Sequence, residues 1–430
     1  MPTVDEWDAA LQAPRIVQIE SSAQLLNEVQ RKQHQRDGYL AARNKPVPLR
    51  KPLQTVAGYD PPLELSIQPI QLLHRLGVVT TPAVENLADL CSTWAYYRYL
   101  WAFEFPHGGL GPDWLRLSSH AMEIDFHQKG LMSDQLGVGM AALLMGALFS
   151  ASEAADVSTA LNDPAWNFTL GRESPDYLFF NPAQTHLYVV ECKGTRGSRQ
   201  AAVDQLRRGT EQLPSLEFQD GRLPPSGLVI GTMMNRTRFR VLLIDPPGDD
   251  EPQIDAFGDD GPQIEEGERP RKTGIRSWEI PNSEKFELAT RSVSQAKALA
   301  FSGFDDAAAK KMANLYERRR AVRRSAPRRT VGTENEFGRF SGVQESIIVQ
   351  EGVRVEIFQG LDETLRNAYL RDDRDEIVAV HDRVAAVAIA KHPDSTLRGF
   401  AVGRDQRFDT RILRSVGPDG TLLEIRLTPG

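Results

Sequence analysis

Two short apolar segments, 177–180 and 187–190, give the clearest strand pattern in the chain. Both are rich in aromatic and β-branched residues, which favour strands. Between them lies the segment Asn-Pro-Ala-Gln at 181–184, whose first two residues favour turns. The pattern therefore predicts an antiparallel hairpin.

Charged residues gather at one end of this hairpin. Side chains alternate between the two faces of a strand, so Glu191 and Lys193 share one face and Cys192 points to the other. Asp176 opens the partner strand and reaches the same end. The hairpin is thus expected to place two carboxyl groups and one lysine together.

Apolar segments before and after the hairpin predict the rest of an α/β core. The run 136–149 is apolar, contains three glycines and predicts a buried helix, which we expect to begin at an N-cap at Ser133. It is shorter than the roughly 20 residues that cross a bilayer. We expect a first strand at 166–170, and the later apolar runs 227–232 and 239–244 predict two more strands of the same sheet.

Further helices are predicted on both sides of this core. Residues Leu87, Leu90, Cys91, Trp94 and Trp101 recur at helical spacings and are expected to share one packed face. The segment 114–127 reads as a solvated strand or loop. A metal site built from its histidines and acids is the weaker alternative, because they lack a familiar ligand spacing.

Five regions follow from these patterns: a mainly helical region at 1–110, an α/β domain at 111–247, an acidic linker at 248–270, a helical segment at 271–330 and an α+β module at 331–430. The linker is predicted because nine acids lie among prolines and glycines in 246–268. Helices at 283–301 and 305–324 and paired strands near the C-terminus define the last two regions.

Composition restricts the class of protein. The chain has 430 residues and a formal charge of −7, so any nucleic-acid binding must be local. Its two cysteines have no paired spacing, which argues against a disulfide framework and a thiolate metal site. We expect a cytoplasmic protein without a membrane segment, because no secretory signal pattern precedes the first helix.

The chemistry of the hairpin end points to a cation. Two carboxylates held together repel each other unless a proton or a cation lies between them. Mg²⁺ is commonly held by one or two carboxylates, water and substrate phosphates. Lys193 can then orient an attacking water or offset charge on the phosphate. The competing interpretation is an exposed hairpin in which Glu191 and Lys193 form a surface ion pair.

Pro175-Asp176 followed by Glu191-Cys192-Lys193, with 15 positions separating the two acids, resembles the PD-(D/E)xK nuclease superfamily. The resemblance covers about residues 115–247. It implies a restriction-endonuclease-like mixed central sheet flanked by helices, a Mg²⁺-dependent endonuclease in which Mn²⁺ can substitute, and DNA as the default substrate. It also implies that Asp134 joins the metal ligands and that Gln205 assists the site, whereas Asp134 as a simple helix-end charge is the alternative.

Positive side chains supply candidates for contacts with nucleic acid. Arg208 lies on the predicted helix after the hairpin, and a dense cluster follows the helical segment: Arg318, Arg319, Arg320, Arg323 and Arg324. Such a cluster can follow a phosphate backbone. It can equally neutralise the acidic linker of the same chain.

Two other functions stay open at this point. One is a nuclease-like scaffold that binds a partner protein or nucleic acid without cutting, and the other is an RNA-directed nuclease. No phosphate-binding loop of the GxxxxGK[ST] type occurs, so any ATPase or helicase must be a separate chain. A role in bacterial defence against foreign DNA is an extrapolation from the resemblance.

Overall fold

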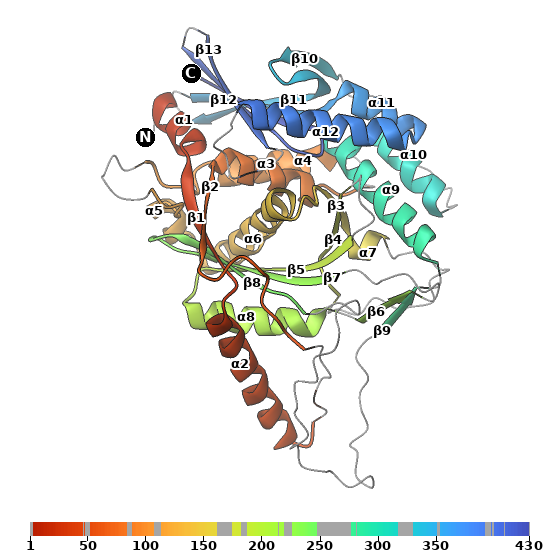
Figure 1. Ribbon diagram of the computed structural model, residues 1–430. Helices are drawn as coiled ribbons and strands as arrows, with labels where there is room; N and C mark the ends of the chain where they lie inside the picture. Colours follow the sequence, from red (N-terminus) through yellow and green to blue (C-terminus); the bar gives the residue numbers. More distant parts are fainter. Residues whose placement is uncertain are drawn as a thin grey trace.

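The computed structural model describes residues 3–45, 47, 52–83, 88–106, 113–160, 174–181, 187–213, 215–218, 226–246, 277–280, 282–316, 330–350, 353–391, 397, 400–407 and 409–429. Within them the protein is mixed α/β, with two large sheets and helices around and between them (Figure 1). The predicted first strand at 166–170, the acidic linker, and the cluster from Arg318 to Arg324 lie outside the described residues.

The first sheet is mixed and has seven strands in the order β2-β1-β8-β7-β5-β4-β3. The pairs β1–β8 and β5–β7 are parallel and the other neighbours are antiparallel. The predicted hairpin is confirmed as β4–β5, and both later strands are confirmed as β7 and β8. The strands are β1 (Arg15–Glu20), β2 (Leu63–Ile67), β3 (Glu153–Asp156), β4 (Tyr177–Phe180), β5 (Leu187–Thr195), β7 (Ser226–Met234) and β8 (Phe239–Ile244).

The second sheet is antiparallel and curled, with the order β10-β11-β12-β15-β14-β13. Together with helices α11 (Glu363–Arg371) and α12 (Arg374–Lys391) it forms the α+β arrangement predicted for the C-terminal part. Its strands are β10 (Val331–Asn335), β11 (Gly338–Gln350), β12 (Val353–Asp362), β13 (Ala401–Arg407), β14 (Thr410–Val416) and β15 (Thr421–Pro429). A further short parallel pair joins β6 (Ser215–Phe218) and β9 (Ser277–Ile280).

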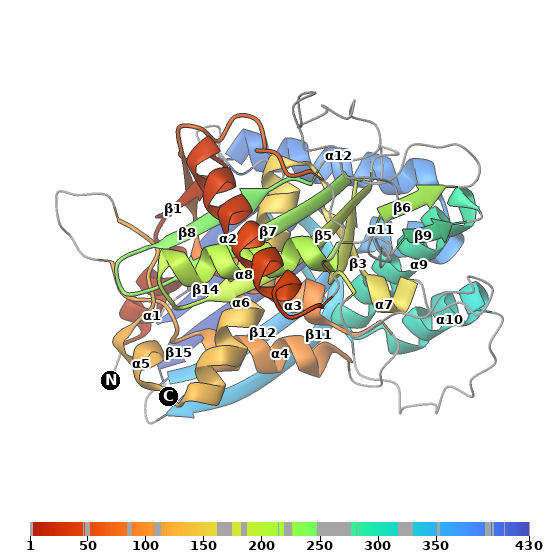
Figure 2. The same ribbon diagram turned by 90° about the horizontal axis from the view of Figure 1, so that it is seen from below.

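Helices form layers on both faces of the first sheet (Figures 1 and 2). Helix α6 (Phe126–Leu148) packs on β5 and β7, and α3 (Pro69–Thr80) lies between α6 and the second sheet. On the opposite face α8 (Arg199–Gln212) covers β5 and β7, and α2 (Ala23–Ala41) packs on α8. One hydrophobic core therefore joins α3 and α6 to strands of both sheets.

The remaining helices complete the outside of the molecule. Helices α9 and α10 form the pair predicted in the helical segment, with the break at Ser302-Gly303, where Gly303 has φ +76°. The bounds are α1 (Val4–Gln12), α4 (Ala88–Tyr99), α5 (Ser119–Glu123), α7 (Val157–Ala160), α9 (Ser283–Phe301) and α10 (Asp305–Tyr316).

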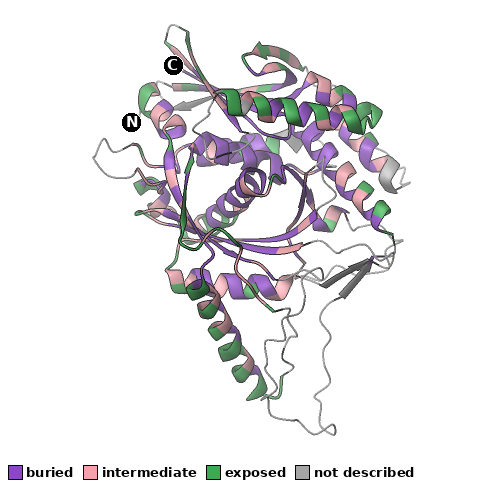
Figure 3. Ribbon diagram, viewed as in Figure 1, coloured by how far each residue is buried: buried purple, intermediate pink, exposed green. Residues whose placement is uncertain are grey.

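Helix α6 is the buried core helix that its apolar pattern predicts, as the colouring in Figure 3 shows. It has the length and composition to cross a membrane, but 72% of its most apolar window is buried inside the protein. Its predicted start is wrong. Asp125 is the N-cap, accepting hydrogen bonds from two backbone N–H groups, whereas Ser133 lies inside the helix and donates its hydroxyl hydrogen to the carbonyl of Lys129.

Three other predictions needed correction. The region 1–110 is mainly helical as predicted, but its strands β1 and β2 belong to the first sheet. On α4 the predicted packed face is wrong, since the side chain of Trp94 is 66% exposed while Tyr96 is buried. The segment 114–127 is a strand-like loop only in its first half, because α5 and the start of α6 occupy its second half. Among the described residues no group of three histidines, cysteines or acids has metal-binding geometry.

A buried polar network connects α3 to the turn between β14 and β15. Arg75 forms an ion pair with Asp419 and donates a hydrogen bond of 2.7 Å to the carbonyl of Ser152. Both ring nitrogens of His74 lie 3.0 Å from hydroxyl oxygens, those of Ser415 and Thr421. Arg75 lowers the pKa of Asp419, and burial lowers that of His74 to about 3. The network thus holds the C-terminal sheet against the central helices.

Candidate active site

The predicted site lies at a notch in the first sheet, at the point where β4 begins. Tyr177 pairs with Val190 at the start of β4, but β5 continues to Thr195. Beyond this pair β5 has a strand neighbour only on the β7 side in the described part of the chain. Asp176 stands at the mouth of the notch, where one of its carboxylate oxygens accepts a 2.8 Å hydrogen bond from the backbone N–H of Cys192.

Glu191 has an unusual environment for a carboxyl group. Its side chain is 0% exposed, and neither carboxylate oxygen accepts a hydrogen bond of normal geometry. Burial, together with the nearby carboxylate of Asp176, raises its pKa to about 8, although Lys193 opposes this shift. Burial also raises the pKa of Asp176, but the N–H of Cys192 and the charge of Lys193 lower it. The two carboxyls are therefore coupled, as the hairpin pattern predicts.

Lys193 links the acids of the site. Its ammonium group forms an ion pair with Glu191, which confirms the predicted shared face, and its side chain is 20% exposed. Its charge also lowers the pKa of Asp134 on α6, which desolvation otherwise raises. Asp134 thus lies close enough to act on Lys193, in the third turn of α6 rather than at the helix end. It does not close a three-acid metal group with Asp176 and Glu191 among the described residues.

Two glycines let helices approach the site. A Cβ atom on Gly194 would lie 1.8 Å from the carbonyl oxygen of Ser133, so α6 can touch β5 only if this residue has no side chain. A Cβ on Gly209 would lie 3.3 Å from Cγ of Glu191 and 2.5 Å from a methyl group of Val229. The residue types at these positions therefore set the depth at which Glu191 is buried between β5 and α8.

The arrangement fits a hard divalent cation. A buried carboxylate that shares one lysine with a second carboxyl is costly unless a proton or a metal compensates the remaining charge. Mg²⁺ binds through one or two carboxylates, with water and phosphate oxygens completing its coordination. Asp176 and Glu191 would supply these carboxylates. Bound there, the metal would stabilise negative charge on a phosphate and lower the pKa of a coordinated water.

Gln205 and Arg208 lie on the predicted helix, but on different sides of it. Gln205 is one turn before Gly209 on α8, so it shares the side that faces β5. Within the described residues no hydrogen bond joins it to the acids or to Lys193. Arg208 is 59% exposed and forms a 3.2 Å ion pair with Asp204, so the structure does not bring it to the carboxylates.

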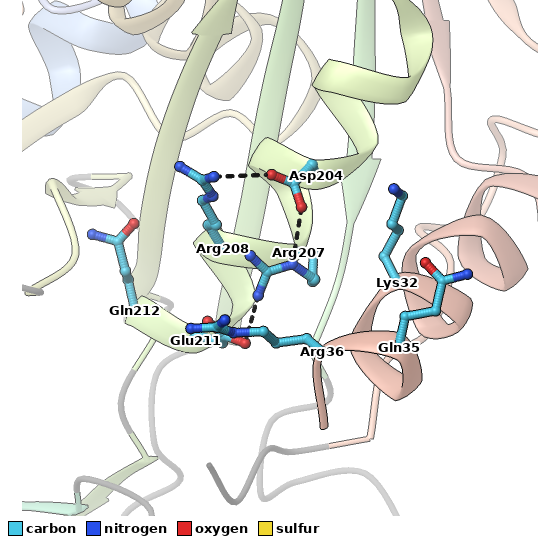
Figure 4. A pocket seen from close by; sticks show the side chains of 8 residues that line it. All are labelled: Lys32, Gln35, Arg36, Asp204, Arg207, Arg208, Glu211 and Gln212. Atoms are coloured by element: carbon cyan, nitrogen blue, oxygen red, sulfur yellow. Dashed lines mark hydrogen bonds and ion pairs between the residues drawn. The ribbon is translucent and has the colours of Figure 1, made fainter. Parts of the chain in front are cut away.

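Arg208 instead lines a groove of about 610 Å³ between α2 and α8 (Figure 4). Two cations of α2, Lys32 and Arg36, face it from the other side. Arg207 is held by Asp204 and Glu211. The full lining is Lys32, Gln35, Arg36, Asp204, Arg207, Arg208, Glu211 and Gln212, with a formal charge of +2 from four cations and two acids. The groove is a mildly basic surface on the outer layer.

Sequence reasoning missed two contributors to this site, the backbone N–H of Cys192 and the close approach at Gly194. It also missed Arg196 just past the end of β5, whose Nε and one Nη make no hydrogen bond. The glycine directly after Lys193 was the available signal for close packing of a helix. No pattern along the chain distinguishes Arg196 from its neighbours, because its environment depends on α5.

Comparisons of the chain with protein-family models, with curated proteins and with solved structures found no match.

Proposed function

We propose that the protein is a metal-dependent nuclease of the PD-(D/E)xK type, which hydrolyses phosphodiester bonds with DNA as its default substrate. One observation carries the proposal. Two coupled carboxyls and a lysine meet where β5 extends past β4, and the buried carboxylate of Glu191 has to share Lys193 with the carboxyl of Asp176. A structural ion pair would not need the second acid, whose presence raises the pKa of Glu191.

Each side chain has a distinct role in this proposal. Asp176 and Glu191 hold Mg²⁺, or Mn²⁺ in its place. Lys193 orients the attacking water and offsets the negative charge that develops on the phosphate. Asp134 lies near Lys193 on the α6 side, where the charge of that lysine lowers the pKa of the Asp134 carboxyl. The order of helix, mixed sheet and helix around β5 supports a restriction-endonuclease-like core.

The setting of the protein is part of the same proposal. A cytoplasmic enzyme that acts in bacterial defence against foreign DNA, with a separate ATPase or helicase as partner, is consistent with this chemistry. The acidic chain would meet nucleic acid through local cations such as Arg208 and the cluster from Arg318 to Arg324.

Cleavage assays test the proposal directly. Purified protein is incubated with single- and double-stranded DNA and RNA, in Mg²⁺, in Mn²⁺ and in EDTA. We expect cutting that requires metal and falls by about 100-fold or more in Asp176→Asn and in Lys193→Met. Lys310→Met on α10 is the matched control, because it removes an exposed lysine far along the chain and should cut normally.

Two results would count against this function. If the parent protein cuts no substrate with either metal, the remaining interpretation is a nuclease-like scaffold that binds without cutting. Cutting by folded Asp176→Asn at the parental rate would show that the activity belongs to another site or a contaminant. A preference for RNA would change the proposed substrate and leave the proposed hydrolysis of phosphodiester bonds unchanged.

A further inference from the structure

Arg196 lies just past the end of β5, three residues after Lys193. A strand rises about 3.3 Å per residue, so the two Cα atoms are about 10 Å apart along the strand direction. The intervening edge of β5 is the part of the notch that β4 does not cover. The guanidinium of Arg196 lies on the α5 side of this edge, where it contacts Met122, whereas Glu191 is covered by α8. A chain that crosses the edge of β5 beside Asp176 would therefore pass from one group towards the other.

Arg196 is partly exposed, but part of its guanidinium is buried without a charged partner among the described residues. Its Nε and one Nη are inaccessible and make no hydrogen bond, while the other Nη donates to Sδ of Met122 at 2.9 Å. A thioether is a weak acceptor and carries no charge. Burial lowers the pKa of Arg196, and no carboxylate offsets this among the described residues. The guanidinium nevertheless stays charged, which makes an unpaired position expensive.

Two arginines near Arg196 in the sequence do have acidic partners. Arg199, three residues later, donates hydrogen bonds of 2.8 and 2.7 Å to the two oxygens of Glu20 and one of 3.0 Å to Glu28. Arg207 pairs with two acids on its own helix. Both of these arginines have acids as partners, whereas no carboxylate of the described residues forms an ion pair with Arg196.

We propose that Arg196 binds a backbone phosphate of the substrate, next to the phosphate that lies at Asp176, Glu191 and Lys193. A guanidinium matches phosphate geometry and strength of hydrogen bonding better than any uncharged acceptor. Phosphate is favoured over the carboxylate of a protein partner because this edge of β5, which pairs with no strand on that side in the described part of the chain, leads to the candidate phosphodiester site. This inference rests on the proposed function for the identity of the ligand.

Binding measurements in a non-cutting background separate this inference from catalysis. The parent for the test is Asp176→Asn, titrated with a short fluorescent DNA, its duplex and the matching RNA at several salt concentrations. Added Arg196→Met should weaken binding by about tenfold or more and reduce the slope of log affinity against log salt by about 1. Arg196→Lys keeps the positive charge but loses the paired donors of the planar guanidinium. The slope of log affinity against log salt should therefore stay the same, while the affinity falls.

The melting temperature of the ligand-free protein distinguishes an arginine that binds phosphate from one that supports the fold. We expect the ligand-free Arg196→Met protein to melt at the parental temperature or above it, because an apolar side chain replaces an unpaired buried charge. An arginine that only supports the fold would instead lower the melting temperature. Arg339→Met, on an exposed strand position paired with Glu334, is the control for loss of one positive charge.

The salt slope decides the outcome. An unchanged slope and affinity in Arg196→Met, or in Arg196→Lys if the methionine variant does not fold, would overturn the assignment. Absence of binding to every oligonucleotide would overturn it as well. If binding depends on Arg196 while the protein with the unchanged sequence never cuts, the phosphate site stands and the nuclease function fails.

Discussion

Two buried polar clusters in this protein have opposite characters. In the network of His74, Arg75 and Asp419, the carboxylate has a charged partner and its pKa is lowered. At the notch, Glu191 is equally buried and pairs with Lys193, but burial and the neighbouring carboxyl of Asp176 raise its pKa to about 8. In the first cluster only Nε of Arg75 is left without an acceptor.

The difference separates a structural contact from a candidate binding site. A satisfied network keeps the long side chains of α3 and the β14–β15 turn in one geometry and leaves no group for a ligand. A carboxylate that is buried but not satisfied makes the free protein less stable and makes a cation at that place more favourable. The comparison predicts that substitutions in the two clusters have effects of different sign.

The largest effect is expected from Asp419→Ala. It leaves Arg75 buried without its carboxylate and should lower the free energy of unfolding by about 3–5 kcal/mol. Denaturant unfolding measures this loss. Glu334→Ala, which removes an exposed ion pair with Arg339, is the control and should cost less than about 1 kcal/mol. Equal losses in the two variants would contradict the structural role of the network.

Gly194→Ala should have the next largest effect. The new methyl group would lie 1.8 Å from the carbonyl oxygen of Ser133, so α6 must move away from β5 at a cost of about 1–3 kcal/mol. Cutting should fall too, because Asp134 moves with α6. Gly130→Ala on the same helix meets no atom within 4 Å and should be neutral or stabilising. A Gly194→Ala protein as stable as the Gly130→Ala protein would show that the approach of α6 is not tight.

A third effect concerns pH in the absence of metal. Glu191 titrates near 8 in the folded protein and near 4.5 when unfolded, so the folded state binds more protons between these values. Stability should therefore fall as pH rises through this window, with a contribution of up to about 1.4 kcal/mol per pH unit from this group. Glu191→Gln should remove that contribution.

Metal should reverse the same dependence. Mg²⁺ requires the ionised carboxylate, so its stabilising effect on the parent should grow as pH rises towards 8 and should be absent in Glu191→Gln. Thermal unfolding with and without Mg²⁺ over this range measures both effects. Identical pH profiles for the parent and Glu191→Gln would mean that Glu191 is ionised throughout, contrary to the raised pKa.

Several parts of the fold could be predicted from the sequence because they depend on neighbouring residues along the chain. The hairpin β4–β5 follows from two apolar runs, and the shared face of Glu191 and Lys193 follows from strand alternation. The apolar character of α6 marked it as a core helix. Its start was misplaced because Ser133 resembles a cap, while Asp125 eight residues earlier performs that function.

Other features depended on packing between distant segments. Strands β1 and β2 are short, and they join the first sheet because β8 supplies a parallel partner for β1. Periodicity on α4 predicted the wrong face, since burial of Tyr96 depends on close contact with Gly77 of α3. A short periodic pattern states which residues share a face and does not state which face is covered.

The sequence by itself determined the local geometry of the candidate site: the hairpin, the acid at its opening, and an acid and a lysine two residues apart on one face. Only the tertiary structure decided how buried each group is and which groups have partners. Burial of Glu191 under α8, the approach of Asp134, and the unpaired guanidinium of Arg196 all arise where segments far apart in the chain meet. Solvation and charge pairing depend on these contacts, because a pKa reports the whole three-dimensional environment of a group.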